Sequence, residues 1–152
     1  MRAFLWCNGD LPSGKILSNF EEISPLFGVD GGGNKAKSLG FHVKEIFGDL
    51  DSIDNDNLET KMTLLKSQNI SDLTKTIVEL SKRGFTEFDI LGADGGDTGH
   101  MLGIWGSLAE LPVDLTIRLH HENSITHRIT SESDNFKINM KKGKKFSIFA
   151  LS

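Results

Sequence analysis

The sequence predicts an α/β protein, with a mainly parallel, Rossmann-like sheet and flanking helices, followed by a small antiparallel β region. Three observations support this prediction. Short apolar runs alternate with helix-like segments over residues 1–118, as in strand–helix–strand units. Acids and glycines follow several of these runs. Glycine occurs only once after Leu111, at Gly143. We therefore expect an α/β domain over residues 1–118 and a partial β-rich domain over 119–152.

Five short apolar runs are typical of buried parallel strands, each ending near a glycine, an acid or a polar turn. The only cysteine, Cys7, ends the first run, and we interpret it as a core residue rather than a reactive thiol. The predicted strands are Phe4–Cys7, Leu26–Val29, Val43–Phe47, Phe88–Leu91 and Val113–Leu119.

The segments between these runs carry apolar residues at helical spacing. Ser71 is a suitable N-cap for the helix that presents Leu73, Ile77 and Leu80 on one face and ends near Gly84. Gly40 is a natural stop for a short helix before it. The other predicted helices are Ser13–Ile23, Lys35–Leu39, Asp54–Lys66 and Thr98–Leu111.

The last segment alternates apolar and polar residues, which predicts antiparallel strands over Ile125–Ile129, Phe136–Met140 and Phe146–Leu151. The basic run Lys141–Lys145 is typical of a hairpin turn. We expect the apolar edge of this region to be covered by another chain or by further residues.

Composition excludes several classes of protein. Residues 1–111 carry 17 acids against 10 basic residues, a net charge of −7, which argues against a nucleic-acid footprint there. No apolar run is long enough for a membrane span, and the N-terminus has no secretory pattern. We expect a cytoplasmic protein, and a phosphate-rich ligand would need metal ions to offset the acidic charge.

Acids follow the predicted strands at the edge where open α/β sheets bind ligands. Asp30 follows the second strand, Asp49 and Asp51 the third, and Asp94 and Asp97 the fourth. The two acids of Gly48-Asp49-Leu50-Asp51-Ser52 would point to the same side of an extended segment, where carboxylates can hold magnesium. The alternative is that Asp49, Asp51 and Asp54 form turns and helix caps. Because Asp30 follows a strand of its own, we favour a metal–phosphate site.

Two further segments give weaker signals. Asp72 and Lys75 are ordinary residues on a first helical turn, but they could bind a metal and a phosphate. Gly95 and Gly96 open a helix whose N-terminus could bind an anion, with His100 nearby. We assign no chemistry to the other histidines, His42, His120, His121 and His127. No P-loop or dinucleotide fingerprint is present.

Taken together, these motifs resemble the thiamin pyrophosphokinase family over about residues 26–104. The matching segments are Val29-Asp30-Gly31-Gly32-Gly33-Asn34, Phe47-Gly48-Asp49-Leu50-Asp51-Ser52-Ile53, Ser71-Asp72-Leu73-Thr74-Lys75 and Leu91-Gly92-Ala93-Asp94-Gly95-Gly96, followed by His100 and Leu102. The segment Gly48-Asp49-Leu50-Asp51-Ser52-Ile53 is the most specific of them.

The resemblance implies a thiamin diphosphokinase, a transferase that moves diphosphate from ATP to thiamin and yields thiamin diphosphate and AMP. It implies a homodimer in which thiamin binds between subunits, partly on the β-rich domain. It implies catalytic roles for Asp49, Asp51 and Asp72, and magnesium bound by Asp30, Asp49, Asp51 and Asp72. The nucleotide-binding residues implied are Asp30, Gly31, Gly32, Asn34, Ser52, Lys75, Gly95, Gly96 and His100.

Three positions depart from the family pattern: Asp97 replaces an arginine, Gly99 an aspartate and Ile104 an asparagine. An acid in place of arginine reverses the charge beside a polyphosphate, unless Lys15, Lys35 or a metal compensates. Two alternatives therefore remain open. One is a related diphosphokinase with another hydroxymethyl substrate, such as a pterin. The other is a non-catalytic nucleotide- or thiamin-binding protein.

Overall fold

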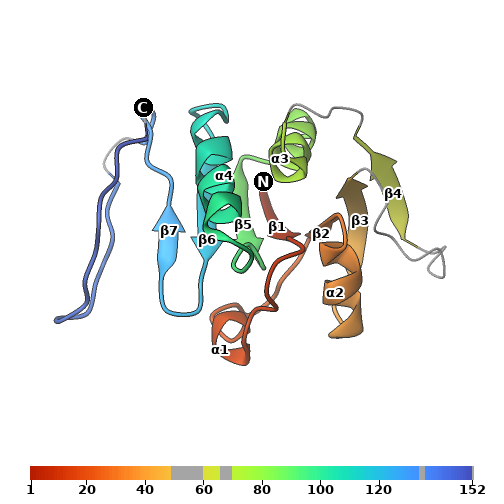
Figure 1. The fold of residues 1–152 in the computed structure, drawn as a ribbon, viewed down its shortest axis with the longest axis horizontal. Helices are drawn as coiled ribbons and strands as arrows, with labels where there is room; N and C mark the ends of the chain where they lie inside the picture. The colour runs from red at the N-terminus through yellow and green to blue at the C-terminus, as the bar shows by residue number, and fades with distance from the viewer. Residues whose placement is uncertain (49–59, 66–69, 134–135, 152) are drawn as a thin grey trace.

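The computed structural model describes residues 1–48, 60–65, 70–133 and 136–151. Within these residues one seven-stranded sheet runs across the molecule in the order β4-β3-β2-β1-β5-β6-β7 (Figure 1). All neighbouring strands are parallel except β6 and β7, which are antiparallel. The strands are β1 (Arg2–Trp6), β2 (Leu26–Val29), β3 (Val43–Gly48), β4 (Lys61–Leu64), β5 (Glu87–Leu91), β6 (Thr116–His120) and β7 (Ile125–His127). The predicted fold class is confirmed.

Helices cover both faces of the sheet. Helices α3 (Asp72–Lys82) and α4 (Thr98–Ala109) pack on one face, and α1 (Gly14–Leu17) and α2 (Gly32–Ser38) pack on the other. The alternation of strand side chains explains the two layers. In β1, Ala3 and Leu5 join the α3–α4 side of the core, whereas Phe4 and Trp6 join the α1–α2 side. No helix in the described part of the chain is long and apolar enough to cross a membrane.

The sequence signals for α3 were accurate. Ser71 is its N-cap, and the Ser71 hydroxyl accepts a hydrogen bond from the Thr74 N–H at 3.2 Å. Leu73, Ile77 and Leu80 are all buried against the sheet. Cys7 is also buried, as expected, and burial, helped by the charge of Asp30, raises the pKa of its thiol to about 12.

Two helix predictions differ from the structure. Residues 61–64 of the predicted Asp54–Lys66 helix form β4, a parallel edge strand in which the Thr63 hydroxyl donates to Glu45 at 2.5 Å. Pairing with β3 outweighs the helical spacing of Leu58, Met62 and Leu65; residues 54–59 and 66 lie outside the described residues. Only Gly14–Leu17 of the predicted Ser13–Ile23 helix is helical, because Phe20 and Ile23 pack on the core from the connecting loop.

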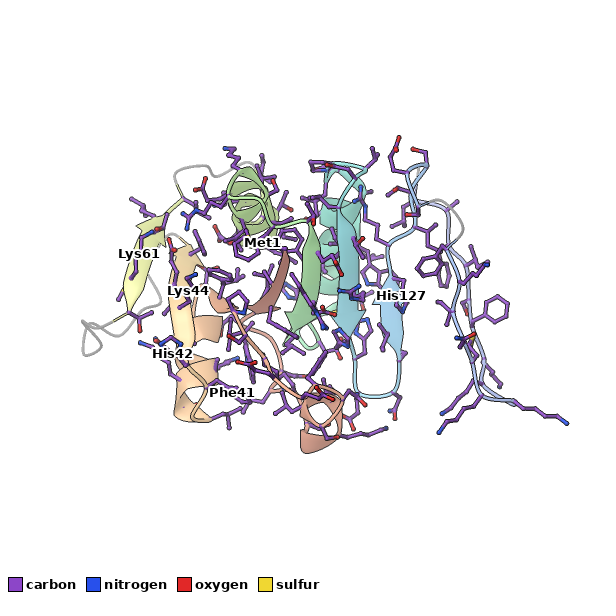
Figure 2. All side chains as sticks on the ribbon, turned by 180° about the vertical axis from the view of Figure 1, so that it is seen from behind. Met1, Phe41, His42, Lys44, Lys61 and His127 are labelled. Carbon is purple, nitrogen blue, oxygen red and sulfur yellow. The ribbon has the colours of Figure 1, made fainter. Side chains whose placement is uncertain are left out.

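The C-terminal segment only partly matches the prediction. β7 forms, but no strand is present in the described residues 136–151, which run beyond β7 at the far end of the sheet from β4 (Figure 1). The predicted turn is present, since the Lys144 N–H donates to the Lys141 carbonyl. Phe146, Ile148 and Phe149 remain 74%, 81% and 70% exposed, because no strand pairs with this segment. In Figure 2 the side chains of this segment lie outside the main body, beyond His127 on β7.

Candidate active site at the carboxyl edge of the sheet

The loops that follow the parallel strands meet at one edge of the sheet. β1 lies in the middle, and the chain moves outward from it first through β2, β3 and β4, then on its other side through β5 and β6. The loops after β1 and β5 therefore leave in different directions at their carboxyl ends. Such a switch point is where open α/β sheets form a ligand crevice.

Asp30 occupies the carboxyl end of β2 in a left-handed backbone conformation, with φ of +49°. A non-glycine residue rarely adopts this conformation, and residues that do are concentrated at functional sites. The Asp30 N–H donates to the Phe47 carbonyl of β3 at 2.7 Å. Its carboxylate lies directly over Gly48, because a Cβ at Gly48 would come within 1.8 Å of Asp30 Oδ1. Asp30 is thus placed at the first residue of the Gly48–Ser52 motif.

The predicted residues Asp49, Asp51 and Ser52 lie outside the described residues. Gly48, the first residue of this motif, is described, and its contacts show which residues lie near it. The Gly48 carbonyl accepts from the Leu65 N–H at 3.0 Å, and the Leu65 carbonyl accepts from the Lys75 ammonium at 3.4 Å. Lys75 in turn forms an ion pair with Asp72. The structure thus connects Asp30, Gly48, Lys75 and Asp72 along the carboxyl ends of β2, β3 and β4.

Glycines allow the loops after β1 and β2 to pack closely at this edge. A Cβ at Gly32 would lie 2.1 Å from the Trp6 carbonyl, and one at Gly31 would lie 2.9 Å from the Asn8 side chain. The start of α2 therefore packs against the end of β1. Lys35 secures this contact, because its ammonium donates to the carbonyls of Asn8 and Gly9, both at 2.7 Å.

Asn34, a predicted nucleotide ligand, lies in the first turn of α2. Its Oδ1 is buried and accepts no hydrogen bond from the described part of the chain. A buried amide oxygen without a donor is unusual, because burying it unpaired costs free energy.

The loop after β5 leads into α4, which begins at Thr98 as the sequence predicted. Asp97 is the N-cap of α4, and its carboxylate accepts from the His100 N–H at 2.8 Å. His100 is exposed, and its ring lies against Gly96. Gly95 and Gly96 have φ of +95° and +77°, which suits glycine. The acid at the family's arginine position therefore begins a helix here.

Sequence reasoning missed three contributors to this edge. The loop Asn8-Gly9-Asp10 follows β1 and pairs with the loop after β5 through Gly9 to Gly92 and Asp10 to Asp94 backbone hydrogen bonds of 2.9 and 2.6 Å. His120 and His121, to which we assigned no chemistry, bond to Asp89 and Asp94 respectively. The available signal was their position, since all three contributors lie at or just beyond the carboxyl ends of parallel strands.

The carboxylate oxygens at this edge are suitable ligands for a hard cation. The Asp30 carboxylate lies over Gly48, and Asp72 is linked to Gly48 through Lys75 and Leu65. Magnesium prefers such carboxylate oxygens. Within the described residues, no group of three or more His, Cys, Asp or Glu side chains is placed to hold a metal ion. A complete ligand set would thus need the acids of the motif itself.

Comparison with known proteins gives the family. The model of the thiamin pyrophosphokinase catalytic domain matches residues 18–120. No curated protein matches the chain. Among the solved structures, a probable thiamine pyrophosphokinase from Staphylococcus saprophyticus has 26% identity and a TM-score of 0.63 over 80% of this chain and 66% of its own.

Two further structures are similar in fold. The thiamine pyrophosphokinase from Bacillus subtilis has 22% identity and a TM-score of 0.64, over 78% of this chain and 60% of its own. The enzyme from Candida albicans has 17% identity and a TM-score of 0.62, over 82% of this chain and 59% of its own. The chain thus spans about three fifths of the length of these two proteins. Because the family model covers most of residues 1–152, this chain belongs to the thiamin pyrophosphokinase family.

Proposed function

We propose that the chain is a cytoplasmic, magnesium-dependent thiamin diphosphokinase. It would transfer diphosphate from ATP to the hydroxyethyl group of thiamin. The thiamin oxygen forms a bond to the β-phosphorus, the bond from that phosphorus to the bridging oxygen of AMP breaks, and the hydroxyl proton is lost. AMP and thiamin diphosphate are the products. The observation that carries this proposal is the left-handed Asp30, whose carboxylate lies over Gly48 at the start of the acidic motif.

Each group has a proposed role that follows from its chemistry. Asp30, Asp49, Asp51 and Asp72 would hold magnesium, which neutralises phosphate charge when bound. Lys75 is a cation beside Asp72 and would contact a phosphate. Gly31, Gly32, Gly95 and Gly96 let the backbone approach the nucleotide, while Asn34, Ser52 and His100 would bind its polar groups. Asp49, Asp51 and Asp72 are the proposed catalytic acids. Such a site acts mainly by positioning and charge stabilisation.

We also propose that residues 119–152 form a partial β-rich domain that supplies part of the thiamin site in a homodimer. The support is the exposed apolar side chains of residues 136–151, which an isolated chain leaves in water. Sedimentation of the purified chain tests this. A dimer that becomes monomeric on Phe146→Ser plus Ile148→Ser supports the proposal, and a wild-type monomer would contradict it.

One observation favours a second candidate, a non-catalytic nucleotide- or thiamin-binding protein. Asp97 caps α4, so it is engaged as a structural residue at the position where the family pattern has an arginine. The two lysines named as possible replacements are also engaged: Lys35 binds backbone carbonyls, and Lys15 donates to Asn123 at 2.8 Å. An Asp97→Arg variant that gains activity over an inactive wild type would support this candidate.

The deciding experiment is an AMP-release assay with ATP and magnesium, with and without thiamin. Thiamin-dependent AMP from the wild-type chain, lost in Asp49→Ala, is the expected result. The matched control is Asp114→Asn, an exposed acid before β6 at the opposite edge of the sheet, which should leave the rate unchanged. Binding of ATP by calorimetry without AMP release would indicate the non-catalytic candidate. Unchanged magnesium-dependent ATP affinity in Asp49→Ala would remove the site assignment.

A further inference from the structure

Lys35 on α2 holds its ammonium group beside the carboxyl end of β1. Its Nζ donates hydrogen bonds to the carbonyls of Asn8 and Gly9, each at 2.7 Å, in the loop after β1. The residue is half-buried, so solvent reaches the side chain only in part. Carbonyl oxygens are neutral acceptors, and they hold an ammonium in position without cancelling its charge. The chain thus places a positive charge between the loops after β1 and β2.

The loop that accepts these hydrogen bonds is closely packed on both sides. Its Gly9 N–H donates to the loop after β5 at 2.9 Å, and a Cβ on Gly9 would lie 2.1 Å from the Asp94 carbonyl. On the other side, a Cβ on Gly31 would lie 2.9 Å from the Asn8 side chain. Contacts this close leave the loop little room to move. The ammonium of Lys35 is therefore positioned before a ligand binds.

No acid neutralises Lys35 within the part of the chain that the structure describes. None of the ion pairs found there includes this lysine. Lys75 differs, because it is paired with Asp72. An ammonium has three N–H donors, and the described residues accept hydrogen bonds from two of those on Lys35. Lys35 can therefore offer an anion both a charge and a donor.

This cation lies close to the acid on which the proposed magnesium site depends. One helical turn separates Asp30 from Lys35, since the Lys35 N–H donates to the Gly31 carbonyl at 3.1 Å. Both residues also border the loop after β1. Burial, helped by the charge of Asp30, raises the pKa of the Cys7 thiol in this loop to about 12, and Lys35 binds the next two carbonyls. A phosphate chain held through magnesium at Asp30 would pass close to the Lys35 ammonium.

We propose that Lys35 binds the phosphate chain of the nucleotide, in place of the cation that the family pattern has at position 97. Asp97 bears the opposite charge and caps α4. A triphosphate with one bound magnesium keeps negative charge, and an ammonium held in position offsets part of it. The inference rests on the proposed function, but it needs only nucleotide binding and no transfer step.

Three variants separate the charge of Lys35 from its hydrogen bonds. Lys35→Gln is neutral but keeps an amide donor for the Asn8 and Gly9 carbonyls, whereas Lys35→Arg keeps the charge. Lys37→Gln is the matched control, because Lys37 is also a half-buried lysine on α2. The probe is magnesium tripolyphosphate, titrated into the full chain in a calorimeter. We expect the affinity to fall about tenfold or more in Lys35→Gln. Lys35→Arg and Lys37→Gln should bind like the wild type.

A second measurement needs no neutral variant. The side-chain ammonium resonance of Lys35 in the wild-type chain, assigned by its absence from Lys35→Arg, is followed by NMR during the same titration. It should shift saturably, and the resonance of Lys37 should stay in place. A loss of stability in Lys35→Gln cannot produce this shift, because the wild-type fold is observed throughout.

The proposal is overturned by equal tripolyphosphate affinity of Lys35→Gln and the wild type, by an equal loss in Lys37→Gln, by an unshifted Lys35 resonance, or by a wild type that does not bind the probe. The AMP-release assay reports separately on the proposed function. Binding that depends on Lys35 without thiamin-dependent AMP release would refute the proposed transfer alone. Thiamin-dependent AMP release together with probe binding that is independent of Lys35 would refute this inference alone.

Discussion

Asp89 on β5 and Asp30 after β2 are acids of the same sheet, but different parts of the molecule hold them in place. Asp89 sits in ordinary strand backbone, is 0% exposed, and is surrounded by Arg2, Arg118 and His120. Asp30 is half-buried at the carboxyl edge, and the backbone itself is held in a left-handed conformation. The first acid is satisfied by side chains and the second is positioned at the expense of backbone strain. This contrast separates a stabilising carboxylate from one that we expect to serve binding.

Removal of the charge at Asp89 should give the largest loss of stability. Asp89→Asn leaves three basic groups around a neutral side chain, and breaking such a buried network costs about 3–5 kcal/mol. We expect the lower end, about 3 kcal/mol, because the side chains of Arg2 and Arg118 are 46% and 21% exposed and can be hydrated. Urea unfolding measures this difference. Its control is Glu87→Gln, which removes the 48%-exposed partner of Arg118 and should cost less than about 1 kcal/mol. Equal losses of unfolding free energy in Asp89→Asn and Glu87→Gln would show that the buried Asp89 network does not stabilise the fold more than an exposed ion pair does.

The same network predicts how stability depends on pH. The pKa of Asp89 is lowered in the folded state, so its contribution is fully present above the unfolded value of about 3.9. It is lost as pH falls toward the folded value. Glu45 adds to this trend, because hydrogen bonds from Arg83, Thr63 and Lys61 outweigh burial and lower its pKa. Unfolding free energy should therefore fall most steeply below about pH 4. Burial, helped by Arg118, lowers the pKa of His127, which adds a smaller loss as pH falls below the unfolded value of about 6.5.

Asp89→Asn provides the control for the pH profile. This variant lacks the titrating group, so its unfolding free energy should fall less steeply in acid than that of the wild type. The measurement is urea unfolding of both proteins at several pH values between 7 and 3. Parallel curves would mean that Asp89 does not contribute to the acid sensitivity.

Replacement of Asp30 should have the opposite effect on stability. Asp30→Gly relieves the left-handed conformation and should leave the unfolding free energy unchanged or raise it by up to about 1 kcal/mol. Asp30→Asn keeps a side chain that tolerates this conformation and removes only the charge. Both variants should lose at least tenfold in magnesium-dependent ATP affinity by calorimetry. A destabilised Asp30→Gly with normal ATP affinity would show that the acid is structural, like Asp89.

The two acids also differ in how readily the sequence reveals them. Asp30 follows an apolar run and precedes three glycines, so the strand-end rule and the family motif both indicate it. Asp89 lies inside an apolar run, and its partners Arg2 and Arg118 are 87 and 29 residues away in the chain. Their meeting depends on the strand order β1-β5-β6, which no local pattern specifies. The parallel strands other than β4 and the α3 cap were predictable because they depend on neighbouring residues.

The features that the sequence did not predict also depend on contacts between residues far apart in the chain. β4 carries apolar residues at helical spacing, and only pairing with β3 and the Thr63–Glu45 contact make it a strand. His120 and His121 have no ligand spacing in the sequence, and their roles arise from the approach of β5. Asp97 lies in the loop after β5, as predicted, and it also caps α4, a role that the sequence analysis did not state. Local signals thus indicated most of the buried strands and the α3 cap, and tertiary contacts decided the partners of Asp89 and the fate of residues 61–64.

The smallest expected change in stability tests the contact between Asp30 and Gly48. In Gly48→Ala the new Cβ would meet the Asp30 carboxylate, which is the far end of a side chain and can rotate away. The unfolding free energy should therefore fall by less than about 1 kcal/mol, while the displaced carboxylate weakens magnesium-dependent ATP binding. The matched control is Gly103→Ala on α4, where nothing lies within 4 Å of the new Cβ and helix propensity should add about 1 kcal/mol. Calorimetry and urea unfolding on both variants separate the two effects. If Gly48→Ala binds ATP as the wild type does, the position of the Asp30 carboxylate over Gly48 does not matter for the nucleotide.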